Sequence, residues 1–224
     1  EWLEYYNSKG VKYPRNLYNA FVSTLDARVG DLVNKLEELG LKGNTIIVFQ
    51  SDNGHSTEQR AHNGGGNAGP YRGAKQCLFE GGIRVPAAIT WPNRIPKGAV
   101  RDQFAVNADW MPTLAELCGI KLDTEELDGK SLLPVINNSK IGSLHSEVFC
   151  WQFGKMWAAR KGKWKLLGNP YDTSNRDYTF TEKRFLVNLE EDLGESKNLA
   201  EEHPEIVAQL EQQYEKWLIN NNRN

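Results

Sequence analysis

The residues with the clearest chemical potential follow directly on an apolar run. Residues 45–50 read T-I-I-V-F-Q, and just after them come Asp52, Asn53, Gly54 and His55. A short apolar run is typical of a buried strand of a parallel sheet, and ligands bind just outside the carboxyl ends of such strands. Asp52 and Asn53 offer oxygen atoms, the ligands that Ca²⁺ and Mg²⁺ prefer. The sequence Asp-Asn-Gly also favours a simple turn, so the run alone leaves both interpretations open.

Two basic residues come next, in a glycine-rich setting. Residues 62–70 read H-N-G-G-G-N-A-G-P, and Arg72 and Lys75 lie just beyond them. Glycine lets the backbone approach a ligand closely, and Arg and Lys can meet an anion as a planar fork and as a point charge. A flexible surface loop with a solvated basic pair is the alternative. His62 could shape a substrate subsite, but we favour an exposed loop histidine.

The periodicity of apolar residues predicts the elements that position these side chains. Apolar residues recur at steps of three and four over residues 17–36, which predicts a helix with a core-facing side. A short turn and the strand at 45–50 follow, and this order is typical of an α/β layer. Residues 86–91 read as a second short buried strand. Asp109 suits the N-cap of a helix that ends at Gly119.

The pattern changes after Pro134. Four short runs rich in aromatic and β-branched residues predict a small antiparallel sheet, and an apolar face from Pro204 onward predicts a last helix. The polar stretch 136–144 suits a linker. We therefore divide the chain into residues 1–136, part of an α/β domain, and residues 137–224, a small subdomain of antiparallel sheet and helix. The four runs are residues 147–153, 156–160, 163–167 and 184–189.

Composition excludes several classes of protein. The 224 residues are 39% hydrophobic and 25% charged, which suits one large domain or two small ones and argues against disorder. The net charge of −2 provides no basic surface for nucleic acid or an anionic membrane. No apolar run approaches the length of a transmembrane helix. Three cysteines allow at most one disulfide and do not decide the compartment.

The order of these motifs resembles the sulfatase family of the alkaline-phosphatase-like superfamily. The resemblance rests on S-D-N-G at residues 51–54, R-G-A-K at 72–75 and E-G-G-I-R-V-P at 80–86. It extends over residues 18–224 and is supported by L-D-A-R-V-G at 25–30, D-G-K-S-L-L-P at 128–134, K-W-K-L at 163–166 and N-L-E-E-D at 188–192. The resemblance implies the fold class α/β: part of an α/β/α sandwich, followed by a small C-terminal α+β subdomain. Residues 1–136 would then be the C-terminal part of the sulfatase catalytic domain.

One part of the family pattern is absent from this sequence. Sulfatases carry their nucleophile in a C/S-x-P-x-R signature, where Cys or Ser becomes formylglycine. None of Cys77, Cys118 and Cys150 has proline two residues later. The chain therefore resembles the C-terminal half of a sulfatase, with formylglycine expected in the N-terminal part. Half a sheet leaves an unpaired strand edge and an uncovered apolar face, so we expect the chain to dimerise or to pair with the missing half.

The resemblance implies a role for each candidate residue. Asp52 and Asn53 would be ligands of one divalent cation, most often Ca²⁺ with Mg²⁺ as the alternative, which would polarise the sulfate group. Lys75 would contact the sulfate and offset charge as the S–O bond breaks, so we expect it to be both catalytic and substrate-binding. Arg72 could touch the substrate or brace the loop. His55 could bind the substrate or be a structural histidine.

Two further features read as structural. Glu80 and Arg84 are four residues apart and oppositely charged, so we expect an ion pair that braces the E-G-G-I-R turn. Cys77 is a nucleophile only by residue type, and we expect it to be a small buried residue.

We therefore expect a sulfuric ester hydrolase that cleaves sulfate monoesters, with this chain as a partial catalytic domain that has no turnover alone. Two alternatives stay open: phosphodiester or phosphonate hydrolysis on the same fold, and a non-catalytic homologue that binds sulfated glycans. The expected partner is a sulfated small molecule or glycan, with neither nucleic acid nor membrane insertion. By resemblance, the compartment would be periplasmic, secreted or lysosome-like.

Overall fold

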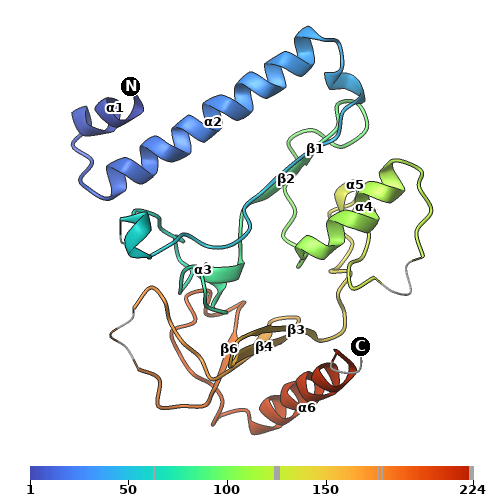
Figure 1. Ribbon diagram of the computed structural model, residues 1–224. Coiled ribbons are helices and arrows are strands. Elements are labelled where there is room, and N and C mark those ends of the chain that lie inside the picture. Colours follow the sequence, from blue (N-terminus) through green and yellow to red (C-terminus); the bar gives the residue numbers. More distant parts are fainter. Residues whose placement is uncertain (63, 124–126, 176, 178, 222–224) are drawn as a thin grey trace.

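Two groups of elements meet at a short helix in the middle of the molecule, shown by a computed structural model (Figure 1). The structure describes residues 1–221 apart from 63, 124–126, 176 and 178. The helices are α1 (Trp2–Ser8), α2 (Arg15–Glu38), α3 (Glu80–Ile83), α4 (Trp110–Leu117), α5 (Leu133–Asn137) and α6 (Pro204–Asn221), with 3₁₀ turns η1 (Lys42–Asn44), η2 (Gln59–Ala61) and η3 (Asn107–Asp109). The strands are β1 (Ile47–Gln50), β2 (Ala87–Thr90), β3 (Phe149–Phe153), β4 (Met156–Lys161), β5 (Trp164–Gly168) and β6 (Arg184–Asn188).

The helix predicted over residues 17–36 is present as α2, but its apolar side is not a core face in this structure. None of the residues of α2, all of them described, is buried, and Phe21 is 70% exposed. The helix packs against α1, where the Tyr6 hydroxyl lies 2.7 Å from the Ser23 hydroxyl. The periodicity therefore predicted the helix correctly, whereas its burial depends on a partner that the described residues do not provide.

The strand that leads into Asp52 is also present, but among the described residues it does not belong to the parallel sheet that we expected. Among the described residues, β1 pairs with no strand other than β2, and the two run antiparallel from Ile47–Thr90 to Gln50–Ala87. The apolar run of β1 correctly predicted a strand, but it carries no information on the direction of the strand that pairs with it. That direction follows from the loop of residues 51–86, which brings the chain back alongside β1 in the opposite sense.

The C-terminal sheet is antiparallel as predicted, in the order β3-β4-β5-β6. Side chains alternate between the two faces of a strand. Trp157, Leu166 and Leu186 therefore lie on the face covered by α6, where the Trp157 ring stacks on Tyr214 with 4.2 Å between ring centroids. Pro204 begins α6, as expected from its suitability for a first helical turn. This face forms a two-layer core of sheet and helix.

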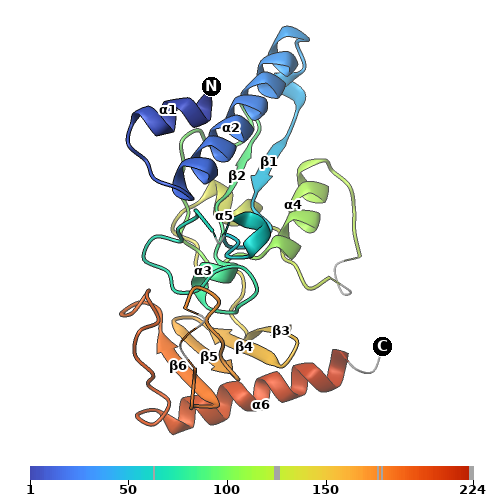
Figure 2. The same cartoon turned by 60° about the vertical axis from the view of Figure 1, so that its left-hand side comes forward.

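The opposite face of the same sheet packs on the segment that contains α3 (Figure 2). Leu167, Phe185 and Val187 point to this side and contact Phe79, which is fully buried. Phe79 belongs to the N-terminal part of the chain, so the two parts share one core. The boundary between residues 136 and 137 stays a prediction.

Asp109 ties together the segments around α4. The helix begins one residue later, at Trp110, as predicted, but the Asp109 side chain does not cap it. Its carboxylate instead accepts hydrogen bonds from the backbone N–H groups of Val106 and Lys130, each at 2.8 Å, and lies 2.9 Å from His145 Nε2. Asp109 thereby holds the start of α4 against two loops that are distant in the sequence.

In the part of the chain that the structure describes, no helix has the length and apolarity needed to cross a bilayer. The three cysteines are free thiols: Cys77 and Cys150 are buried and Cys118 is exposed.

Candidate active site

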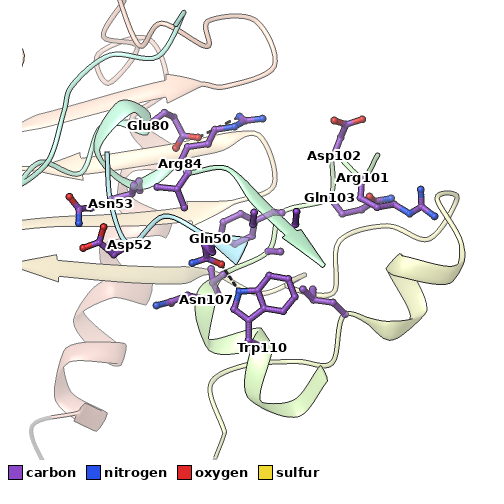
Figure 3. Close-up of a pocket in the computed structure, with 18 of the residues that line it drawn as sticks. Gln50, Asp52, Asn53, Glu80, Arg84, Arg101, Asp102, Gln103, Asn107 and Trp110 are labelled. Carbon is purple, nitrogen blue, oxygen red and sulfur yellow. Dashed lines mark hydrogen bonds and ion pairs between the residues drawn. The ribbon is translucent and has the colours of Figure 1, made fainter. Parts of the chain in front are cut away.

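A cavity of about 940 Å³ opens at the end of β1. Asp52, Asn53 and Lys75 line it together, so three of the predicted site residues face one space. Figure 3 shows the side chains of Asp52 and Asn53 next to each other at the strand end. Gln50, the last residue of β1, accepts a hydrogen bond from the indole N–H of Trp110 and so connects the strand to α4 (Figure 3).

Main-chain contacts fix the turn that carries Asp52 and Asn53. The Ser51 hydroxyl donates to the Asn53 carbonyl at 2.9 Å, and the Gly54 N–H donates to the Gly82 carbonyl at 2.9 Å. A Cβ atom at Gly54 would lie 1.9 Å from the carbonyl oxygen of Gly81, which no side chain can tolerate. Glycine is therefore required at position 54 for the close approach of two backbones.

The side chains of Asp52 and Asn53 fit a hard divalent cation in their chemistry. A carboxylate and a carboxamide oxygen sit at a cavity wall, with Asp52 exposed and Asn53 half-buried. Ca²⁺ takes six to eight oxygen ligands and Mg²⁺ takes six. The described residues contain no cluster of three or more His, Cys, Asp or Glu that could hold a metal ion. Asp52 and Asn53 can thus serve as part of a metal site, whose remaining ligands must come from elsewhere.

Lys75 is tied to the same turn through its backbone. Its N–H donates to the His55 carbonyl at 2.9 Å, which joins the R-G-A-K loop to the turn two residues after Asn53. The Lys75 side chain is 31% exposed, and its ammonium group lies 3.6 Å from Glu58 Oε2. Hydrogen bonds from Arg60 and Ser56, with the charge of Lys75 in support, lower the pKa of Glu58. Lys75 thus lines the cavity while its ammonium group forms an ion pair with Glu58.

The geometry of Arg72 favours the bracing role of the two we considered. Its Nε donates to Asp172 Oδ2 at 2.7 Å, and its Nη1 donates to the main-chain oxygen of Glu195 at 2.9 Å. The guanidinium also lies over the ring of Phe79, 4.6 Å from the centroid. Burial would raise the pKa of Asp172, but hydrogen bonds from Ser174 and Arg72 lower it. Arg72 is thus held by the C-terminal subdomain.

The two histidines of this region favour structural roles. The side chain of His55 packs against Gly66. A Cβ atom added at Gly66 would lie 2.2 Å from the Cβ of His55. Burial, helped by the charge of Arg15, lowers the pKa of His55, and its Nδ1 is buried without a hydrogen-bond partner among the described residues. His62 is exposed and lies 3.3 Å from the Tyr13 hydroxyl. Asn63, in the same glycine-rich motif, lies outside the described residues.

The predicted ion pair of Glu80 and Arg84 is confirmed, with Nη1 of Arg84 3.6 Å from Glu80 Oε2 (Figure 3). Glu80 has a stronger partner that we did not predict. Lys165 on β5 is fully buried, and its ammonium lies 2.8 Å from Glu80 Oε1 and 3.0 Å from Glu195 Oε1. Arg160 adds a longer contact of 3.8 Å to Glu80. A buried cluster of three charged residues, Glu80, Lys165 and Glu195, therefore joins α3 to the C-terminal sheet.

The charges of this cluster support one another unequally. Burial alone would raise the pKa of Glu80, but the charges of Lys165, Arg160 and Arg84 and the hydrogen bond from Lys165 lower it. Burial raises the pKa of Glu195. The charge of Lys165 opposes this shift, and the nearby charge of Glu80 adds to it. Burial would lower the pKa of Lys165, but the two carboxylates raise it. The surroundings thus stabilise the charged form of Glu80 and disfavour the charged form of Glu195.

Part of the cavity wall is aromatic. Phe104, Trp151 and Arg160 contribute to this wall, and the Arg160 guanidinium lies 4.5 Å from the centre of the Phe104 ring. Phe104 and Trp151 meet edge to face, 5.8 Å apart. Aromatic faces beside polar groups suit a ligand with both apolar and hydroxylated surfaces.

Comparison with known proteins gives consistent matches along the chain. The sequence model described as Sulfatase matches residues 4–120, more than half of the chain. The model described as N-sulphoglucosamine sulphohydrolase, C-terminal, matches residues 71–220. The two ranges overlap across the segment that carries Lys75 and Glu80.

Individual relatives agree with these matches. The chain is 31% identical to arylsulfatase A of Bos taurus over 92% of its own length and 45% of that protein. It is 37% identical to steryl-sulfatase of Homo sapiens over 62% of its own length and 24% of that protein. The crystal structure of Ps i-CgsB in complex with k-i-k-neocarrahexaose superposes with a TM-score of 0.78 and 28% identity, over 92% of this chain and 44% of that one. The chain thus spans less than half the length of these relatives.

Proposed function

The chain belongs to the sulfatase family, and from this premise we propose that the full protein is a sulfuric ester hydrolase that cleaves sulfate monoesters. The observation that carries the proposal is that Asp52, Asn53 and Lys75 line one cavity. A carboxylate, a carboxamide and an ammonium group suit the recognition of an anionic ester together with a cation. We propose that Asp52 and Asn53 are metal ligands and that Lys75 is catalytic.

The proposed roles follow from the charge changes during ester hydrolysis. When a Ca²⁺ or Mg²⁺ ion is bound, it supplies a positive charge that polarises the sulfate oxygens. Asp52 and Asn53 would hold that ion with one negative charge rather than two, which leaves the site able to admit an anion. Lys75 would donate a hydrogen bond to the sulfate ester and stabilise the negative charge that develops as the S–O bond breaks. We expect the formylglycine nucleophile from a segment outside these residues.

We assign Arg72 and His55 supporting roles rather than substrate contacts. Arg72 is bound to Asp172 and Glu195, and these bonds hold the loop that carries Lys75. His55 contributes its carbonyl to the Lys75 backbone and its ring to the packing on Gly66. Both residues would shape the site without touching the reacting atoms.

We propose a sulfated carbohydrate or sulfated small molecule as the substrate. The aromatic wall formed by Phe104 and Trp151 supports this, since sugars present apolar faces and hydroxyl groups. A structurally similar protein is described in complex with k-i-k-neocarrahexaose, which supports a saccharide. A phosphodiesterase or phosphonate hydrolase is less well supported, because the relatives named above are sulfatases. A purely glycan-binding homologue is less well supported for the same reason. We expect a periplasmic, secreted or lysosome-like compartment.

The test compares hydrolysis of para-nitrophenyl sulfate and of bis(para-nitrophenyl) phosphate by the protein at its full natural length. We expect turnover of the sulfate, and a loss of about 10²- to 10³-fold in kcat for Lys75→Ala, as for removal of one charge-stabilising donor. Lys155→Ala, in an exposed turn between β3 and β4, is the matched control and should keep wild-type activity. Preferred hydrolysis of the phosphate diester, or full activity of Lys75→Ala, would contradict the proposal. The chain of residues 1–224 alone should show no turnover.

We also propose that another polypeptide segment covers the exposed apolar side chains of α2. Phe21 is 70% exposed and Leu32 is 62% exposed, on a helix whose main contacts among the described elements are with α1 and η1. A second copy of the chain and the remainder of the protein are the two candidates. Light scattering of residues 1–224 over a range of concentrations tests this, and a strictly monomeric chain would argue against self-association.

A further inference from the structure

One residue of the C-terminal subdomain, Glu195, accepts hydrogen bonds from both ends of the segment that carries Lys75. Glu195 Oε2 accepts a hydrogen bond from the backbone N–H of Glu80 at 2.5 Å. The main-chain oxygen of Glu195 accepts a hydrogen bond from Arg72 Nη1 at 2.9 Å. Arg72 and Glu80 stand on either side of Lys75, so two bonds from a single residue pin the segment at its start and at its end.

The pinned segment forms a closed loop. The Gly81 N–H donates to the Arg72 carbonyl at 2.6 Å, which brings the two ends of the segment together. Thr173, also in the C-terminal subdomain, donates from its hydroxyl to the Ala74 carbonyl at 3.0 Å. These bonds restrict the loop backbone on the side of Glu195, and Lys75, within the same loop, lines the cavity.

The backbone conformation and the burial of Glu195 both cost free energy. Its side chain is fully buried, it adopts a positive φ of 49°, and its Oε1 lies 3.0 Å from the buried ammonium of Lys165. A non-glycine residue at positive φ and a buried carboxylate each cost free energy, so both persist only where the surrounding contacts compensate. The compensating contacts here are those to the Lys75 loop and to Lys165.

We propose that Glu195 is a positioning residue that fixes Lys75 at the candidate site from the C-terminal subdomain. The inference rests on the proposed function for the role of Lys75, but its structural part does not. The Arg72–Glu80 segment would adopt its closed form only when Glu195 is in place. The C-terminal subdomain would then support catalysis by positioning Lys75, although Glu195 itself would not contact the substrate.

Amide hydrogen exchange on the full-length protein tests the structural part. In Glu195→Ala, the amides of Lys75 and Gly81 should exchange about 10- to 100-fold faster, because a charged hydrogen-bond acceptor has been removed. The amides of α6, on the far face of the sheet, should keep their wild-type rates. Glu202→Ala is the matched control, since Glu202 forms only an exposed ion pair with Lys197 at 2.7 Å in the described structure. If Glu195→Ala loosens α6 and the sheet as well, Glu195→Asp replaces it, because it keeps a carboxylate near Lys165 while its shorter side chain draws that carboxylate away from the Glu80 N–H.

A double-mutant cycle on the same protein tests the functional part. Glu195→Ala should lower kcat for para-nitrophenyl sulfate by about tenfold or more, as for a misplaced catalytic group. The same substitution should have little further effect in the Lys75→Ala background, because the group that it positions is already gone. A merely structural role would reduce both backgrounds by equal factors.

The outcomes separate this inference from the proposed function. Unchanged exchange at Lys75 and Gly81 in a folded Glu195 variant overturns the inference, and so do equal activity losses in the two Lys75 backgrounds. A wild-type protein that does not hydrolyse the aryl sulfate removes the proposed function. In that case the exchange measurement still decides whether Glu195 orders the loop.

Discussion

Replacing Lys165 by methionine should lower the free energy of unfolding by about 3–5 kcal/mol, the cost of removing one partner from a buried ion pair. Lys165 is fully buried, and its ammonium lies 2.8 Å from Glu80 Oε1 and 3.0 Å from Glu195 Oε1. Methionine is unbranched and one atom shorter than lysine, and it removes the ammonium group with its charge and its hydrogen bond to Glu80. Arg84 and Arg160 remain within 4 Å of Glu80, so Glu195 is the carboxylate that loses its ion pair.

Urea denaturation followed by far-UV circular dichroism measures the loss, with wild type and variant at equal protein concentration. A domain is stable by about 5–15 kcal/mol, so a loss of this size moves the midpoint well outside experimental error. Lys161→Met, the same substitution at an exposed position at the end of β4, should stay within about 0.5 kcal/mol of wild type.

Removing the orphaned charge should restore stability. The double variant Lys165→Met with Glu195→Gln should recover at least about half of the loss, because a neutral amide is far cheaper to bury than an unpaired carboxylate. A loss below about 1 kcal/mol for Lys165→Met, or no recovery in the double variant, would refute the reasoning. The first result would mean that water reaches the cluster, and the second that methionine disturbs the packing rather than the charge balance.

Three other predictions follow from the site. Burial and the charge of Arg15 lower the pKa of His55 in the folded chain. The folded chain should therefore lose stability as the pH falls from about 6.5, the pKa in the unfolded chain, through the lower pKa of the folded chain. His55→Gln should flatten the pH dependence of the urea midpoint, and an unchanged slope would contradict this. Gly54→Ala should cost about 1–3 kcal/mol in the same assay because its Cβ meets the Gly81 carbonyl, and wild-type stability would argue against the close approach. Asp52→Ala should weaken Ca²⁺ binding by the full-length protein by about tenfold or more in calorimetry, whereas equal affinity would remove Asp52 from the ligand set.

The elements with strong periodicity could be predicted from the sequence. The alternation of Phe185, Leu186 and Val187 between the two faces of the sheet is visible as a β-type run, and the structure confirms the strand as β6. The helix α1 was missed because the first 14 residues show no apolar period. Its residues are not buried, and packing against α2 holds it in place. Local signals therefore identified elements, whereas tertiary partners decided α1 and the direction of the β1–β2 pair.

The site divides in the same way. Asp52, Asn53 and Lys75 could be named because their residue types, order and glycine neighbours carry information locally. The cluster of Glu80, Lys165 and Glu195 could not, because its members come together only in the folded chain. One signal was available: Lys165 is two residues from Leu167 in a predicted strand, so both face the same side, and a lysine on an apolar face needs a buried partner.

The contacts around Glu195 also bear on the order in which the protein is completed during synthesis. Arg72 meets Asp172 across 100 residues of sequence and Glu195 across 123, and Glu80 meets Glu195 across 115. Contacts of such long range form late, because the closure of large loops must precede them. A ribosome that has released the Lys75 loop must add well over a hundred further residues before its anchor emerges. The candidate catalytic lysine is therefore set in place only after Glu195 has been synthesised, and a nascent chain that stops before Glu195 would carry the whole R-G-A-K motif without the anchor that orders it.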